Sequence, residues 1–463
     1  MGIHPAILRR KKRGSLYNVL GNEPALVSDM VRDTHRSGGV RQDFDDIFTT
    51  DRTSEATQTN SAGVVVWGPH NLALNSATPA TQSITVVSGA DYTVECTGSG
   101  SITLSGAGTG TVTEGNPVEV TASTTSLTLT VAGDVDLMWC YRSDLGGMAP
   151  VPVDARVSGI DTYVPTTSTA KYLPRRHHHV YSGGAWVDAG TLVETEARTQ
   201  LLHTTDALVT QSVTTTAEAH TLHFTGTGTV TLSGTSTAGP LVGTGTGEEN
   251  RVSLTFTPTA GTLTLTVSGT VTDAQLEVGS IPSSYIPNLA ASGTVPRAAD
   301  TGGLTIDSSV IGAALGGSMP DGVSISIKGR ISYADTGVVE EAVFTRWYFG
   351  PGHYLVNRLR TLGALTGTIQ TIHMYSGVAD FVEGSDDYSP GVNVPFNIAS
   401  RHNSGALNNA SNGLAATEDN TPAGISDLSA TDLVVAYDFM GCIEEVRVWS
   451  VDIGDAGIAE ATA

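Results

Sequence analysis

The chain has 463 residues, of which 53 are glycine and only 15% are charged, and its formal net charge is −22. This length predicts two to four domains, and a composition rich in Thr, Ser and Gly favours many short strands over charged helices. The negative charge argues against a nucleic-acid binder and against attraction to an anionic membrane surface. No run of about 18 apolar residues predicts a membrane span.

Residues 1–45 differ from the remainder because they carry five clustered positive charges and no sustained apolar period. One interpretation is a disordered terminus. We favour an extended docking arm that becomes ordered against an acidic surface of a partner. No hydrophobic stretch follows the cluster, so no secretory signal is predicted. The basic residues are Arg9, Arg10, Lys11, Lys12 and Arg13.

Two stretches that begin 128 residues apart, at positions 92 and 220, repeat one pattern. Tyr92–Gly106 reads YTVECTGSGSITLSG, and His220–Gly234 reads HTLHFTGTGTVTLSG. Thr or Ser alternates with an apolar residue in both, which places one residue type on each face of a strand. Register, turns and apolar positions all agree, and this favours duplication over chance similarity. We therefore predict two related β-sandwich modules, at residues 46–155 and 156–300.

Each module is expected to contain strands at short, regular spacing. In the first module they are predicted at 83–87, 92–96, 101–105, 118–121, 127–131 and 135–141. In the second they are predicted at 212–215, 221–224, 229–233, 251–256, 263–267 and 271–278.

The three cysteines, Cys96, Cys140 and Cys442, are too few and too scattered to predict a disulfide framework or a zinc site. Cys96 occupies the position of Phe224 in the second copy, so we expect it to act as a small apolar core residue.

Several runs in the second module carry a family resemblance. ARTQLL at 197–202, AQLEVGSIPSSYIP at 274–287 and PRAAD at 296–300 resemble a carbohydrate-binding-like jelly-roll module common in virion proteins of tailed bacteriophages. The upstream runs YLPRRH at 172–177 and GTLVE at 190–194 resemble the leader of that family. The first copy lacks the closing run. The resemblance implies jelly-roll modules on a structural protein located in the virion.

Residues 301–463 are predicted to form a separate β domain. Met440–Trp449, followed by a short helix from Asp452, resembles the end of concanavalin-like, laminin-G-type lectin domains. In phage proteins of this kind such a domain often follows the jelly-roll module. The predicted fold is thus all-β, with tandem jelly-roll sandwiches, a concanavalin-like sandwich and an extended N-terminal arm.

Two groups of side chains are candidates for metal binding. Asp386, Asp387 and Asp419 are expected in acidic loops, which could hold Ca²⁺ but are more often simply solvated. The run His177–His179 is a weak candidate, because successive strand side chains point to opposite faces. We therefore predict no cofactor, with Ca²⁺ as the alternative.

Tyr354 and Tyr388 are the preferred candidates for stacking on sugar rings, because both lie in turn-rich surroundings where exposure is expected. The sequence contains no nucleophile, phosphate-loop or metalloprotease motif, and no carboxylate pair suited to glycoside hydrolysis. The chain is accordingly predicted not to be an enzyme.

These observations predict a structural component of a tailed-phage particle, such as a tail fibre, head fibre, spike or decoration protein. It would dock through its arm and bind host surface glycans. One alternative is a capsid-stabilising decoration protein without glycan binding, and another is a polysaccharide-degrading tailspike. The strands at Thr221–Phe224 and Thr229–Ser233 lack the Lys or Pro that protects an exposed edge, which predicts a homo-oligomer. The resemblance to phage fibres favours a trimer.

Overall fold

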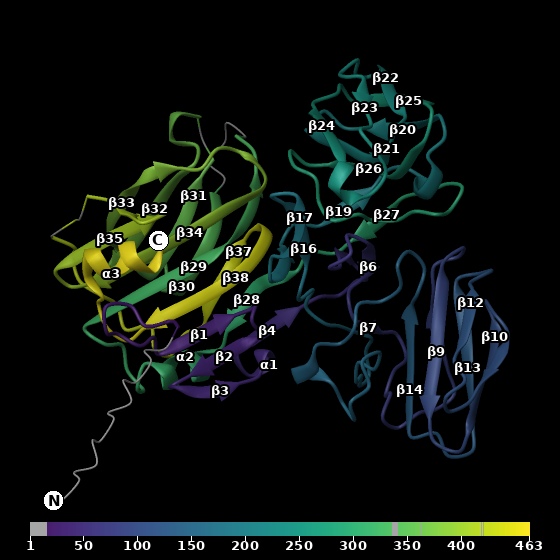
Figure 1. Cartoon of the computed structure of the whole chain (residues 1–463), viewed down its shortest axis with the longest axis horizontal. Helices are drawn as coiled ribbons and strands as arrows, with labels where there is room; N and C mark the ends of the chain where they lie inside the picture. Colours follow the sequence, from purple (N-terminus) through teal and green to yellow (C-terminus); the bar gives the residue numbers. More distant parts are fainter. Residues whose placement is uncertain (1–15, 336–340, 362, 418, 420) are drawn as a thin grey trace, which may run out of the picture.

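The computed structural model describes residues 16–335, 341–361, 363–417, 419 and 421–463, and it confirms the predicted all-β class (Figure 1). Within these residues no helix is both long and apolar enough to cross a membrane. The helices are α1 (Phe44–Ile47), α2 (Ser308–Ala314) and α3 (Gly454–Ala461), with single 3₁₀ turns η1 (Val153–Ala155), η2 (Thr205–Ala207), η3 (Glu248–Asn250) and η4 (Gly363–Leu365).

The first small sandwich packs two antiparallel sheets around an apolar core. Alternation along β9 (Asp91–Thr97) explains the packing, since Tyr92, Val94 and Cys96 are buried while their neighbours are half-exposed. One sheet has the order β11 (Gly110–Val112), β10 (Ser101–Gly106), β13 (Ser126–Ala132), β8 (Gln82–Thr85). The other has the order β12 (Val118–Thr121), β9, β14 (Leu137–Arg142).

The second small sandwich repeats this strand order, in agreement with the duplication inferred from the sequence. Cys96 and Phe224 are both buried at the matching position, as expected. The first sheet has the order β20 (Gln211–Thr215), β25 (Gly261–Ser268), β22 (Thr229–Gly234), β23 (Leu241–Val242). The second has the order β24 (Val252–Phe256), β21 (His220–Gly226), β26 (Val271–Val278).

The large sandwich contains most of residues 301–463 and holds an aromatic core around Phe344, Trp347 and Phe396. Its first sheet has the order β3 (Val40–Gln42), β2 (Thr34–Ser37), β1 (Leu26–Asp29), β38 (Met440–Trp449), β29 (Gly322–Tyr333), β34 (Gly391–Asn403), β35 (Ala406–Ser411), β36 (Leu414–Ala415). Its second sheet has the order β33 (Val378–Asp387), β32 (Thr368–Tyr375), β31 (His353–Arg360), β30 (Glu341–Gly350), β37 (Leu433–Asp438), β28 (Thr301–Ile306), β4 (Phe48–Asp51).

The boundary predicted at residue 45 for an extended arm is wrong, because residues 16–51 belong to the large sandwich. β1 pairs antiparallel with β38, and β4 pairs antiparallel with β28 (Figure 1). Leu26, Phe44 and Ile47 are buried in the same core as the C-terminal strands. The apolar stretches within residues 16–51 are too short to show the periodicity of a strand in the sequence. The strands they pair with, β28 and β38, lie in the C-terminal part of the chain. The basic cluster Arg9–Arg13 lies outside the described residues.

The edge strands expected in the second small sandwich are also corrected. β21 is hydrogen-bonded to β24 and β26, and β22 is hydrogen-bonded to β23 and β25. Neither strand is an edge, so the argument from unprotected edges no longer supports a homo-oligomer. The trimer remains an expectation from the family resemblance alone.

The two small sandwiches take up residues 82–142 and 211–278, less than the predicted modules, because their flanking segments form a junction between the three sandwiches (Figure 1). β18 (Thr191–Glu194) extends the large sandwich by pairing with β38. The remaining junction strands pair as β5 (Thr57–Thr59) with β6 (Val65–Trp67), β7 (His70–Asn71) with β15 (Lys171–Tyr172), β16 (His179–Ser182) with β17 (Ala185–Asp188), and β19 (Arg198–Gln200) with β27 (Val295–Arg297).

Candidate functional site

Four side chains gather on the outer face of the second sheet of the large sandwich. The guanidinium carbon of Arg346 lies 4.4 Å from the ring centre of Tyr348 and 4.3 Å from that of Tyr437. The cation is therefore held between two aromatic rings. Tyr348 is also the cross-strand neighbour of Tyr354, and their ring centres lie 5.9 Å apart. We call Arg346, Tyr348, Tyr354 and Tyr437 the Tyr348 patch.

Strand alternation places the β30 members of the patch. Thr345 and Trp347 are buried and face the core, so Arg346 and Tyr348 face outward. Tyr354 follows on β31, directly opposite Tyr348 in the antiparallel register.

A β-bulge brings Tyr437 into the patch. Ala436 has a positive φ of 57°, and the pairing of β37 with β30 shifts register at this point. Val435 and Ala436 are both buried, so the next side chain, Tyr437, turns outward onto Arg346. Strict apolar–polar alternation along β37 would place Tyr437 on the core side of the sheet. The sequence pattern therefore could not predict that Tyr437 faces outward, because the bulge at Ala436 reverses the alternation.

The exposure of the patch leaves it available to a ligand. Tyr348 is 38% exposed and Tyr437 is 41% exposed. Within the described residues no carboxylate pairs with Arg346, so its remaining N–H donors are free of an ion-pair partner. Aromatic faces beside charged hydrogen-bond donors suit a ligand that offers both C–H surfaces and oxygen acceptors.

Of the two tyrosines predicted to stack on sugars, the structure brings only Tyr354 to this surface. Tyr388 is 6% exposed and lies in the core of the large sandwich, where its carbonyl accepts a hydrogen bond from the Tyr333 hydroxyl. The prediction of an exposed Tyr388 is wrong, because its ring packs among core residues from strands distant in sequence.

The acidic candidates for Ca²⁺ do not form one loop. Asp386 and Asp387 fall at the end of β33 rather than in a loop, and their side chains lie outside the described residues. One carboxylate oxygen of Asp419 accepts hydrogen bonds from the N–H and hydroxyl of Thr421 at 2.8 and 3.1 Å. These side-chain hydrogen bonds are those of a local turn.

The three consecutive histidines have separate partners. His177 lies 2.9 Å from a carboxylate oxygen of Asp188, and His179 bonds the His177 carbonyl at 2.8 Å. The Nδ1 of His178 accepts a hydrogen bond from the Thr59 N–H at 3.1 Å. No common metal position joins them.

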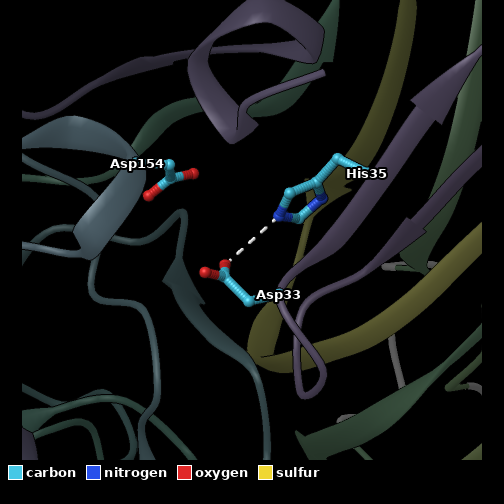
Figure 2. Close-up of side chains that lie close together, drawn as sticks. All are labelled: Asp33, His35 and Asp154. Carbon is cyan, nitrogen blue, oxygen red and sulfur yellow. Dashed lines mark hydrogen bonds and ion pairs between the residues drawn. The ribbon is translucent and has the colours of Figure 1, made fainter. Parts of the chain in front are cut away.

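Figure 2 shows a cluster that the sequence did not suggest, formed by Asp33, His35 and Asp154 with donor atoms within 4.8 Å of one another. Arg176 already supplies its positive charge, donating to both oxygens of Asp154 at 2.7 and 2.9 Å and also to Asp33. Burial alone would raise the pKa of Asp154, but the hydrogen bonds and charge of Arg176 outweigh it and lower the pKa. Burial, aided by Arg176, lowers the pKa of His35. We conclude that this cluster is an arginine–carboxylate bridge between the large sandwich and the junction.

The sequence runs that carry the phage resemblance meet in one buried ion network. Arg175 of YLPRRH donates to Glu194 of GTLVE at 2.7 Å and to Asp300 of PRAAD at 2.6 Å. Arg297 lies 3.1 Å from the Glu194 carboxylate. The N–H and hydroxyl of Ser284 each donate to that carboxylate at 2.6 Å. The shared motif residues therefore hold the junction together.

The network sets the charge state of its members. Burial alone would raise the pKa of Glu194, but the positive charges of Arg297 and Arg175 hold that pKa well below its usual range. Arg52 also belongs to the network, because its Nε lies 3.4 Å from a carboxylate oxygen of Asp300. Burial, together with repulsion from Arg175, lowers the pKa of Arg52 to about 10. Glu194 is thus a carboxylate at neutral pH, and Arg52 remains a cation.

No protein-family model and no curated protein matches the chain. Similar solved structures include a botulinum neurotoxin type C chain described in connection with two ganglioside molecules, at 12% identity over 34% of this chain and 38% of that chain, with a TM-score of 0.26. They also include the CBM40 of a Ruminococcus gnavus IT-sialidase, at 14% identity over 35% of this chain and 93% of that one, with a TM-score of 0.26. A leech intramolecular trans-sialidase is matched at 16% identity over 34% of this chain and 27% of that chain, with a TM-score of 0.26. The chain thus spans well under half the length of the neurotoxin and the leech enzyme.

Proposed function

We propose that this protein is a non-catalytic structural component of a tailed-phage particle that binds host surface glycans through the Tyr348 patch. The observation that carries the glycan site is the position of Arg346 between the exposed rings of Tyr348 and Tyr437. A sugar ring offers C–H faces to the aromatic rings and hydroxyl acceptors to the guanidinium. Because the patch lies on an open sheet face, it suits a residue within a surface polysaccharide.

The phage assignment is supported by the sequence resemblance over residues 172–300. The residues that carry this resemblance form the buried junction network, which suits a protein whose domains must keep a fixed arrangement. The same rigid junction favours the second candidate, a decoration protein that covers the particle surface and binds no glycan.

A glycan array of bacterial surface polysaccharides tests the site with the full-length chain. We expect Tyr348→Ala and Tyr437→Ala to weaken binding at least about tenfold, the equivalent of about 1.4 kcal/mol. Leu414→Ala is the control, because Leu414 is 59% exposed on the opposite sheet. Absence of binding by the wild-type chain, or equal binding by the patch variants, would reject the patch as a glycan site.

Antibody labelling of purified phage particles tests the second half of the proposal. The particle should carry the label at a fixed position. Labelling without glycan binding would favour the decoration protein, and an unlabelled particle would reject the phage assignment.

A further inference from the structure

A cavity of about 320 Å³ lies where the second small sandwich, the large sandwich and the junction meet. β5 and the β16–β17 hairpin form one side, and residues of η3, β29 and β38 form the others. This volume falls within the range of small-molecule sites, roughly 300–1,000 Å³. The Tyr348 patch contributes no residue to it.

One wall of the cavity is aromatic and already fixed. Tyr181 and Trp186 lie directly opposite each other in the hairpin, with ring centres 5.4 Å apart. The Trp186 ring packs on Gly63, where an added Cβ would lie 2.3 Å from the indole. Tyr181 is 48% exposed and remains open to a ligand.

Two histidines add one donor and one acceptor. The Nδ1 of His178 accepts from the Thr59 N–H at 3.1 Å, so its Nε2 carries the proton of the neutral ring. Burial lowers the pKa of His178 to about 3, which keeps the ring neutral. His179 bonds the His177 carbonyl at 2.8 Å through Nδ1, which leaves its Nε2 as an acceptor.

The charges at the cavity disfavour an anion. Glu248 and Glu249 both line it, and Arg251 is paired with Glu248. Glu249 is exposed and has no cationic partner within the described part of the chain. An acidic ligand would therefore meet an unneutralised carboxylate.

We propose that this cavity is a second ligand site, which binds a neutral saccharide unit. One sugar hydroxyl can accept from His178 Nε2–H and another can donate to His179 Nε2, and the ring face can pack on Tyr181. None of the described side chains that line the cavity is an unpaired arginine or lysine, so the site suits this ligand class better than uronic and sialic acids. The inference stands on the cavity alone and requires neither the Tyr348 patch nor the particle assignment.

Ligand-observed NMR on the full-length chain tests the proposal with methyl glycosides of glucose, galactose, mannose, N-acetylglucosamine and N-acetylgalactosamine. Glucuronate and N-acetylneuraminate serve as acidic comparisons. We expect at least one neutral glycoside to bind at millimolar concentration and the acidic sugars to bind at least about tenfold more weakly. No neutral binding, or equal binding of the acids, would overturn the proposal.

Variants then locate the site. Tyr181→Ala removes an exposed ring and should weaken neutral binding at least about tenfold. Tyr348→Ala should leave this binding intact. If Tyr181→Ala bound the neutral glycosides as well as the wild-type chain does, the cavity would not be the site. If instead only Tyr348→Ala and Tyr437→Ala failed to weaken binding on the glycan array, the result would reject the patch function and leave the cavity proposal standing.

Discussion

Arg175 and Glu194 form an ion pair with an N–O distance of 2.7 Å, in which neither side chain is more than 4% exposed. Removing both charges from water is unfavourable, so the pair depends on its additional partners Asp300, Arg297 and Ser284. Glu194 belongs to β18, which pairs with the large sandwich, whereas Ser284 belongs to the closing run of the second small sandwich. The pair thus fixes one sandwich against the other.

Glu194→Gln is predicted to destabilise the protein by about 3–5 kcal/mol, because it leaves Arg175 and Arg297 buried with fewer compensating charges. The midpoint of urea unfolding measures this. Lys328→Met is the matched control, since Lys328 is 50% exposed and pairs with Glu444 at 3.0 Å. That exposed pair should contribute no more than about 1 kcal/mol. Similar shifts for the two variants would contradict a stabilising role for the network.

Stability should fall in two steps as the pH falls. Burial lowers the pKa of His373 to about 4 and that of His178 to about 3, so the unfolded chain takes up these protons first and stability decreases below about pH 6.5. The pKa of Glu194 is also depressed, so its contribution is present above its unfolded pKa and is lost as the pH falls below about 4.3. Thermal unfolding from pH 8 to pH 3 measures both steps. In Glu194→Gln the loss below about pH 4.3 should be smaller, and an unchanged acid loss would argue against this assignment.

Local patterns predicted the small sandwiches well, because most strands there alternate apolar and polar residues. They did not predict β1–β4, whose partners lie at the opposite end of the chain. Exposure at single tyrosines also escaped prediction. Tyr437 faces outward only because of the bulge at Ala436, and Tyr388 is buried by strands distant in sequence. The runs at 172–177, 190–194 and 296–300 were recognised, but only the folded chain shows that they form one ion network.

A chain that begins after residue 45 should fail to form a stable large sandwich. It lacks β1, which covers β38, and it lacks the buried Leu26 and Phe44. Soluble yield and thermal unfolding measure the loss, with a chain that begins at Leu16 as the control because it keeps every described contact. Equal melting temperatures for the two chains would show that the N-terminal strands are dispensable.

Chelators and reductants should leave the melting temperature unchanged. Arg176 supplies the cation for Asp33 and Asp154, and the three cysteines are buried and unbonded. Arg176→Met should lower the melting temperature, because it leaves carboxylates facing each other without a cation. Differential scanning calorimetry with and without EDTA checks this. A drop of more than a few degrees on adding EDTA to the wild-type chain would instead reveal a bound metal ion.

Equivalent glycines of the duplicated modules should respond alike to substitution. Gly98 and Gly226 both have positive φ. A Cβ added to Gly98 would lie 2.6 Å from the Asp134 carbonyl oxygen, and a Cβ added to Gly226 would lie 2.3 Å from the Thr270 carbonyl oxygen. Alanine at either position therefore adds a backbone clash to the cost of about 1 kcal/mol for the left-handed conformation. Gly89→Ala isolates the conformational cost, since Gly89 has a φ of 89° and no atom within 4 Å of the added Cβ. We expect Gly98→Ala and Gly226→Ala to lower the free energy of unfolding by similar amounts, each clearly more than Gly89→Ala. If either variant matched Gly89→Ala, the close approach of that strand pair would not be a shared constraint of the duplicated fold.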